Sequence, residues 1–121
     1  MMSCILRIAV PNVKALLPKL SMRPYRVESE TAHFDVSDAD FDNFKVQIED
    51  AISFLRSNET DVKLLMSEPD ASGELDFGIE WREIASQVDT LPSTLVRLAG
   101  ELGLDIALSH YPTSEESNAK A

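Results

Sequence analysis

The sequence predicts a single α+β domain: a two-layer sandwich in which helices cover one face of a mixed or antiparallel sheet of four to five strands. Three observations lead to this prediction. Short β-rich runs alternate with stretches whose apolar residues recur every three or four positions, which are the periods of strands and helices. Their order is β-α-β-β-α-β-α-β, whose first six elements match the split βαβ, ferredoxin-like pattern, followed by an α-β extension. With 121 residues, of which 44% are hydrophobic, the chain has the size of one domain with one core.

The first predicted strand spans residues 4 to 10, an apolar run bounded by Pro11 that suits the centre of a sheet. Asn12 then suits the N-cap of a short helix, and Pro18 limits that helix to a turn or two. The apolar residues of this helix recur at helical spacing: Val13, Leu16, Leu17 and Leu20.

The stretch from residue 25 to residue 36 is β-rich but changes its alternation. Tyr25 and Val27 place the apolar side chains on odd positions, whereas Phe34 and Val36 place them on even positions. One regular strand cannot do this, because a shift of one residue moves every side chain to the other face. Either two short strands are joined by a turn near residues 28 to 30, or one strand carries a bulge there; we favour two strands.

A long helix is the clearest predicted element. One stripe of residues steps by three or four throughout: Phe41, Phe44, Ile48, Ala51, Leu55, Asn58, Val62 and Leu65. Ser37 or Asp38 suits the N-cap, and Asp38, Asp40 and Asp42 favour the positive end of the helix dipole. The sequence therefore predicts one helix, from about residue 38 to residue 65, that anchors the core.

The remaining elements follow from alternation and from turn residues. A loop at residues 69–73 precedes a predicted strand at 75–82, which has one apolar and one polar face. Pro92 suits position N1 of a helix that stops at Gly103, and a last strand is predicted at 104–111. The domain is expected to span residues 1–111, and the polar tail at 112–121 to be disordered.

The charge and the single cysteine limit the classes of function. There are 21 Asp and Glu against 11 Lys and Arg, a net charge of -10, which disfavours binding to nucleic acid or to an anionic membrane and leaves a basic protein partner or self-association. Cys4 lies in an apolar run, where a buried, inert thiol is expected and no intrachain disulfide can form. The start has no basic leader pattern and no apolar run approaches the roughly 20 residues of a membrane helix, so we expect a cytoplasmic protein.

Several stretches resemble a family of small uncharacterised bacterial proteins. They are the start MSCILR at 2–7, VSDADF at 36–41, QIEDAI at 47–52, LDFGIEWR at 75–82, LAGELG at 98–103 and the ending LSHYP. Together they cover most of the chain past residue 30. The resemblance implies a bacterial, cytoplasmic protein, and it supplies no activity or catalytic residue to transfer.

One candidate binding surface is the polar face of the predicted sheet. Six side chains from four strands can gather there: Arg7, His33, Asp35, Asp76, Glu80 and Ser109. Carboxylates near an imidazole could perform general acid–base chemistry, and Arg7 could hold an anion. Charged residues are also the normal result of alternation on an exposed face, where Arg7 could simply pair with Asp76 or Glu80.

No metal site or cofactor site is predicted. Asp38, Asp40, Asp42 and Glu49 have the spacing of calcium-loop ligands, but Asn43 stands where the loop needs glycine, and the apolar stripe demands a helix there. The chain has no zinc-ligand spacing, no glycine-rich phosphate loop and no Gly-x-Ser-x-Gly sequence. Trp81 is expected in the core or at its rim, and His110 in the core at a strand end.

These observations favour a small acidic interaction protein without enzymatic activity, such as an immunity protein or inhibitor, and assign no catalytic residue. The alternatives are a small ligand-binding protein or enzyme that uses the polar face around Arg7, and a homodimeric structural module.

Overall fold

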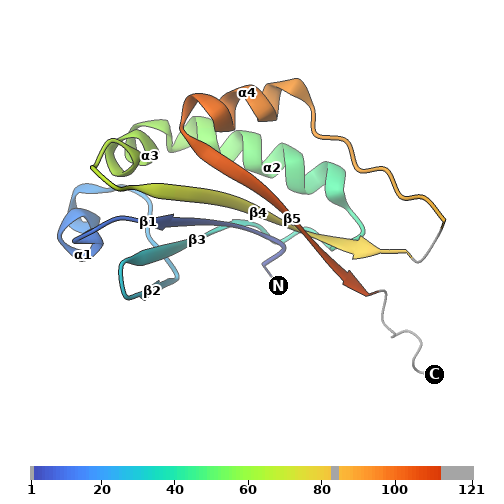
Figure 1. Cartoon of the computed structure of the whole chain (residues 1–121), viewed down its shortest axis with the longest axis horizontal. Helices are drawn as coiled ribbons and strands as arrows, with labels where there is room; N and C mark the ends of the chain where they lie inside the picture. The colour runs from blue at the N-terminus through green and yellow to red at the C-terminus, as the bar shows by residue number, and fades with distance from the viewer. Residues whose placement is uncertain (1, 83–84, 113–121) are drawn as a thin grey trace.

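The computed structural model describes residues 2–82 and 85–112 (Figure 1). The five strands are β1 (Cys4–Ala9), β2 (Arg26–Glu28), β3 (Thr31–Ser37), β4 (Ser72–Trp81) and β5 (Leu104–Pro112). The helices are α1 (Val13–Leu16), the short 3₁₀ turn η1 (Leu17–Lys19), α2 (Phe44–Ser57), α3 (Glu59–Met66) and α4 (Ser93–Glu101). The predicted α+β fold class is confirmed, and the stretch between residues 25 and 36 forms two strands.

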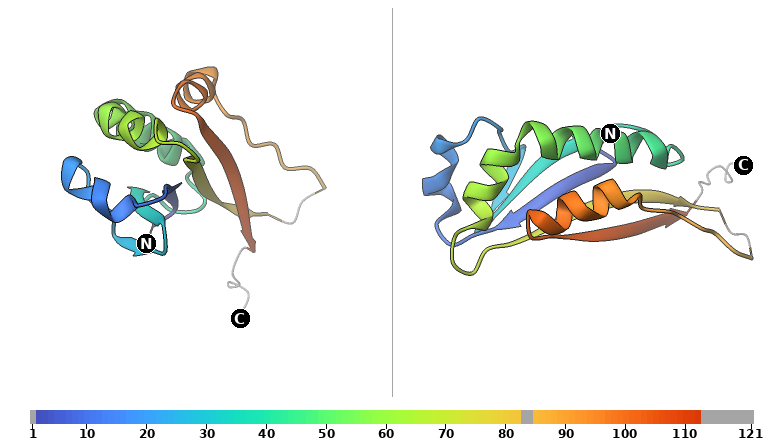
Figure 2. Two further views of the ribbon diagram at one scale, coloured as in Figure 1. Left: turned by 60° about the vertical axis from the view of Figure 1, so that its left-hand side comes forward. Right: turned by 90° about the horizontal axis from the view of Figure 1, so that it is seen from above.

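The sheet has the order β2-β3-β1-β4-β5, with β1 at its centre as predicted. The first four strands pair antiparallel, and β5 pairs parallel to β4 after the α4 crossover. This is the predicted ferredoxin-like core with an α-β extension. Helices α2, α3 and α4 lie over one face of the sheet (Figures 1 and 2), which leaves the other face uncovered by any described element.

The core lies between the sheet and the helices. Leu6 pairs in register with Phe34 on one side and with Leu75 on the other, and all three are buried. The remaining buried residues include Val13 of α1 and Leu55 of α2, which belong to the same cluster. Because side chains alternate along a strand, this register fixes which residues of every strand face the helices.

The predicted single helix is wrong at its middle, where Asn58 separates α2 from α3. The Asn58 side chain donates to the carbonyl oxygen of Phe54 at 2.9 Å, a local bond of the kind by which Asn competes with helical hydrogen bonding. Val62 and Leu65 of α3 are still fully buried, so the apolar stripe predicted the packing correctly although the axis breaks.

The predicted start of this helix is also wrong, because α2 begins at Phe44 and its N-cap is Asn43. The Ser37 hydroxyl instead accepts from the N–H of Ala39 at 3.2 Å and donates to Asp50 at 2.6 Å, which holds the chain in a loop. The aspartates at 38, 40 and 42 therefore precede the helix rather than form its first turn.

Smaller differences concern element ends. Asn12 occupies the N-cap position of α1 with φ 62°, and its side chain makes no capping bond. Ser72 and Gly73, predicted in a loop, belong to β4, and Pro92 directly precedes α4. Pro112 is the last residue of β5, and the rest of the predicted tail lies outside the described residues. No helix among the described residues is long and apolar enough to cross a membrane.

Candidate functional site

The open face is the side of the sheet that points away from the helices. Arg7 pairs in register with His33 and with Glu74, and these side chains point opposite to the buried Leu6 row. The same parity along each strand brings all six predicted residues to this face: Arg7, His33, Asp35, Asp76, Glu80 and Ser109.

Arg7 lies at the centre of a hydrogen-bonded chain on the open face. Its Nη1 is 3.0 Å from Glu74 Oε1 and 3.0 Å from Asp76 Oδ2. Asp76 Oδ1 in turn accepts from the Ser109 hydroxyl at 2.7 Å. Of the two predicted partners of Arg7, Asp76 is right, whereas the second partner is Glu74 rather than Glu80. The guanidinium charge is thus already compensated by two carboxylates.

His33 is, like Asp76, a buried member of the open face, only 8% exposed. Its Nε2 has no hydrogen-bond partner among the described residues, and the nearest carboxylate oxygen, Glu28 Oε1, is 3.7 Å away. Burial lowers the pKa of His33 below its ordinary value, and the positive charges of Arg26 and Arg7 lower the pKa further. The imidazole is therefore neutral at physiological pH.

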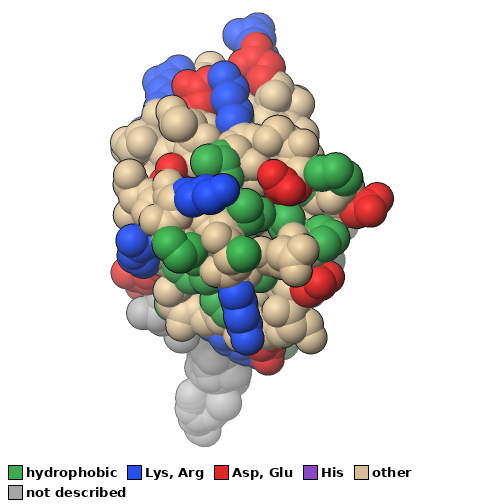
Figure 3. All heavy atoms as spheres, turned by 90° about the vertical axis from the view of Figure 1, so that its left-hand side faces the viewer, with side chains coloured by type: hydrophobic (Ala, Val, Ile, Leu, Met, Phe, Trp, Pro, Cys, Tyr) green, Lys and Arg blue, Asp and Glu red, His purple; other side chains and the backbone are tan. Residues whose placement is uncertain are grey.

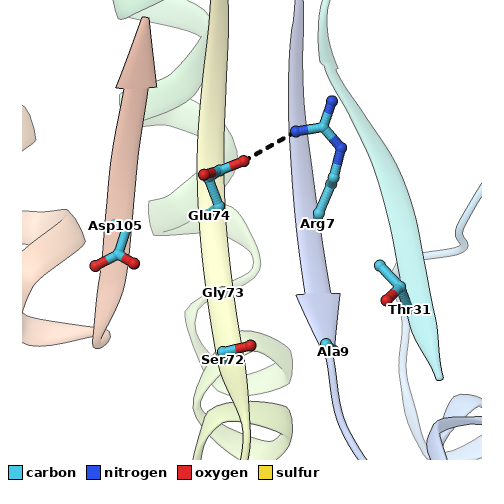
Figure 4. A pocket seen from close by; sticks show the side chains of 7 residues that line it. All are labelled: Arg7, Ala9, Thr31, Ser72, Gly73, Glu74 and Asp105. Carbon is cyan, nitrogen blue, oxygen red and sulfur yellow. Dashed lines mark hydrogen bonds and ion pairs between the residues drawn. The ribbon is translucent and has the colours of Figure 1, made fainter.

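A shallow hollow of about 220 Å³ lies beside Arg7 at one end of the open face (Figure 4). Its lining residues come from four strands: Arg7, Ala9, Thr31, Ser72, Gly73, Glu74 and Asp105. Glu74 and Asp105 are register partners on β4 and β5, so two carboxylates lie side by side. Like charges in this position repel each other. Among the described residues, no cation lies within ion-pair distance of Asp105, so this corner of the face is open to a positive charge.

The open face as a whole is acidic. Among the residues that the strand register places on it, the arginines are Arg7 and Arg26, and Arg26 forms an ion pair with Glu28 of its own strand. Against these two stand six carboxylates, those of Glu28, Asp35, Glu74, Asp76, Glu80 and Asp105. Burial and the neighbouring Asp38 raise the pKa of Asp35, a sign of crowded negative charge.

Two exposed tyrosines lie at opposite ends of the open face. Tyr25, 42% exposed, has its ring centroid 6.0 Å from that of His33. Tyr111, 45% exposed, lies 5.0 Å from the ring of Phe41. The rings of Tyr111 and Phe41 both lie close to Gly78: a Cβ atom added there would be 3.2 Å from Tyr111 and 3.3 Å from Phe41. The sequence had placed Phe41 on the helical stripe, so this aromatic pair was missed.

His110 of β5 and Trp81 of β4 lie on the helical side of the sheet, and the sequence had made a prediction for each. His110 is exposed rather than buried, because it lies at the sheet margin, with Nε2 3.6 Å from Asp89. Trp81 is 43% exposed and meets the His110 ring edge-on at 5.8 Å, which fits the predicted rim position. The two histidines therefore lie on different faces of the sheet and cannot act together. Cys4 is fully buried as predicted, and burial raises the pKa of its thiol.

Two apolar surfaces lie away from the open face. A groove of about 420 Å³ beside α2 is lined mainly by Phe44, Ile48, Ile52 and Pro92, with Lys45 and Glu49 at its rim. At the end formed by α1 and η1, apolar side chains gather between lysine and arginine side chains (Figure 3). Nothing in either surface indicates what would cover it.

The described residues contain no group of three or more His, Cys, Asp or Glu side chains that could hold a metal ion. Comparison of the chain with protein-family models, with curated proteins and with solved structures gave no match. No relative therefore assigns an activity, and the resemblance to uncharacterised bacterial proteins stays a prediction.

Proposed function

We propose that this chain is a small interaction protein without enzymatic activity, of the immunity or inhibitor type, whose acidic open face binds a basic protein. The observation that carries the proposal is the uncovered sheet face itself, on which six carboxylates face two arginines. A surface of this sign attracts a basic partner over a distance and speeds its association.

The chemistry of the face suits a protein rather than a small anion. Tyr25 and Tyr111 offer exposed rings of the residue type that is enriched at interface centres, and the carboxylates between them match lysine and arginine side chains. Asp105, which has no cation within ion-pair distance among the described residues, would hold such a cation beside Glu74, much as Glu74 and Asp76 already hold Arg7.

The alternatives have less support. A ligand-binding protein or enzyme built around Arg7 would need a free guanidinium in a deep site, but Arg7 has two carboxylate partners and lines only a shallow hollow. A homodimer joined through the open faces would bring two acidic surfaces together, which costs energy unless cations intervene.

Co-purification from the native host at low salt tests the proposal. A tagged full-length protein is compared with two variants of equal net charge. Glu74→Gln with Asp105→Asn removes two carboxylates from the open face, and Glu49→Gln with Glu101→Gln removes two exposed ones from the helical side. A basic protein that is retained by the second variant, lost with the first and released by salt supports the proposal.

The quantitative expectation is a five- to thirtyfold loss of affinity for the open-face variant, since each of the two exposed charge contacts contributes roughly 0.5–1 kcal/mol. The helical-face variant should change the affinity less than about twofold. Equal losses in both variants would show that only net charge matters, and repeated recovery of the protein alone would refute the proposal.

A further inference from the structure

The two edges of the sheet differ in how they meet solvent. At one edge, β2 is only three residues long, and Arg26 and Glu28 give it a charged outer surface. At the other edge, β5 pairs with β4 over nine consecutive residues and contains no lysine, and its one proline, Pro112, is its last residue. Figure 2 (right) shows β5 along the margin of the molecule with α4 above it and no described element beyond. Long edges without such protection are templates for pairing with another strand.

Half of the backbone groups of β5 point away from the sheet, and the hydrogen bonds of β4 show which half. The N–H groups of Gly78 and Glu80 donate toward the β1 side, so even residues of β4 face β1 and odd ones face β5. In a parallel pair, each residue bonds to the neighbours of its register partner. Because Leu75 is in register with Ile106, the odd residues of β5 bond to β4. The outward N–H and C=O groups in the middle of β5 are those of Ile106, Leu108 and His110.

The helical side of this edge is apolar. Ile106 and Leu108 pack against the core but are only half-buried, because no sixth strand covers them. On α4, the buried residues Leu95 and Ala99 face the sheet. Because the crossover from β4 to β5 is right-handed and successive residues of a helix are about 100° apart, the residue that follows Leu95 points toward the free edge. That position is Val96, which is 48% exposed. A strand added at β5 would therefore meet apolar side chains on this side.

The open side of the same edge is acidic. Asp105 is exposed on β5, and its register partner Glu74 lies directly behind it on β4. An added strand would place a side chain of its open-facing set next to these two carboxylates. A strand that pairs with this edge would therefore fit best with apolar residues on its helical side and basic residues on its open side.

We propose that β5 accepts an additional β-strand from its partner, an extended segment in which apolar and basic residues alternate. Main-chain hydrogen bonds to Ile106, Leu108 and His110 would supply the pairing, and the alternate side chains the specificity. The proposal rests on the proposed function for the basic character of the partner. A second copy of the chain is the less suitable occupant, since each copy carries a net charge of -10.

Amide hydrogen exchange tests strand addition directly. The probe is a nine-residue peptide that alternates lysine and valine, added to the full-length protein, and the control peptide has the same composition with its lysines and valines in two blocks. We expect the alternating peptide to slow exchange at Ile106, Leu108 and His110 at least tenfold, while Ala107, whose N–H already faces β4, changes little. Unchanged exchange at the three outward amides with the peptide bound, or equal protection by the block peptide, overturns the proposal.

Variants separate this inference from the proposed function. Leu108→Pro removes an outward N–H at the centre of the edge, where proline is tolerated, and should weaken peptide binding at least tenfold, whereas Leu108→Val should weaken it less than threefold. Binding that survives Leu108→Pro in the folded protein but is lost in Glu74→Gln with Asp105→Asn overturns strand addition and leaves the acidic binding face. Binding that is insensitive to both variants overturns both proposals. A doubled mass in solution without peptide, with the three amides already protected, shows that a second copy occupies the edge and also overturns strand addition.

Discussion

Replacing Arg7 by methionine separates a structural charge pair from an anion-binding arginine. Methionine keeps much of the side-chain volume and removes the guanidinium that bonds to Glu74 and Asp76. The Glu74 side chain is 45% exposed and can regain water, but that of Asp76 is 12% exposed and keeps only the Ser109 hydroxyl as a partner. The cost lies between that of an exposed pair, below about 1 kcal/mol, and that of a buried pair, about 3–5 kcal/mol. We expect the free energy of unfolding to fall by about 1–2 kcal/mol.

Urea unfolding followed by circular dichroism at pH 7 measures this loss. Arg97→Met on the exposed side of α4 is the control and should change the unfolding free energy by less than about 0.5 kcal/mol. A double-mutant cycle with Asp76→Asn should give a coupling of about 0.5–1.5 kcal/mol between the two side chains. A loss below about 0.3 kcal/mol for Arg7→Met would refute the structural role.

The same variant bears on the proposed function. Removing Arg7 makes the open face more acidic, so binding of the lysine–valine peptide should strengthen by about two- to fivefold at low salt. An Arg7 that contacts the ligand itself would give the opposite result. Weaker peptide binding by a stably folded Arg7→Met protein would therefore argue against an acidic binding face.

Three further predictions concern the scaffold. Gly73→Ala places a methyl carbon 2.5 Å from Leu104 Cδ2 and should lower the unfolding free energy by about 1–3 kcal/mol, whereas Gly100→Ala meets no atom within 4 Å and should raise it by about 0.5–1 kcal/mol. Urea unfolding of the two variants checks these opposite signs. Gln47→Leu removes a buried 2.8 Å hydrogen bond to a β4 carbonyl and should cost about 1 kcal/mol in the same assay; a more stable variant would contradict this role. The pKa of His33 is lowered on folding, so the unfolded chain binds the proton first and stability falls as the pH drops below about 6.5. The stability of His33→Asn relative to wild type should therefore rise between pH 7.5 and pH 5, and a constant difference would contradict it.

Much of the fold could be predicted because its elements are recorded in local patterns. The alternation in β4 and the change of parity between Tyr25 and Phe34 predicted strands that the structure contains. The helical stripe was less informative at its start and at its middle, because Phe41 and Asn58 have the right spacing but make other contacts. Phe41 packs on Tyr111 across the sheet, and Asn58 bonds to its own backbone. A periodic pattern reports which residues face the core, and it does not report where the backbone leaves the helix.

The candidate site shows the same limit at the level of pairs. Strand parity sufficed to gather Arg7, Asp76 and Ser109 on one face, but positions 74, 76 and 80 of β4 have the same parity. Which carboxylate reaches Arg7 depends on the register of β1 against β4, and that register follows from packing of the whole core. Glu74 was missed as a partner for this reason. The hollow beside it was missed as well, because it forms only where four strands meet.

Asp105 connects the acidic face with the free edge, since it belongs to both. On the open face it stands beside Glu74 without a cation among the described residues, and on β5 it stands one position before the outward-facing backbone of Ile106. A partner bound only by charge would be released by salt and would leave the backbone of β5 unchanged. A partner that adds a strand would protect that backbone and would keep part of its affinity at high salt, because main-chain hydrogen bonds and apolar contacts are screened little. The salt dependence of exchange at Ile106 and Leu108 therefore distinguishes the two modes of binding within a single titration.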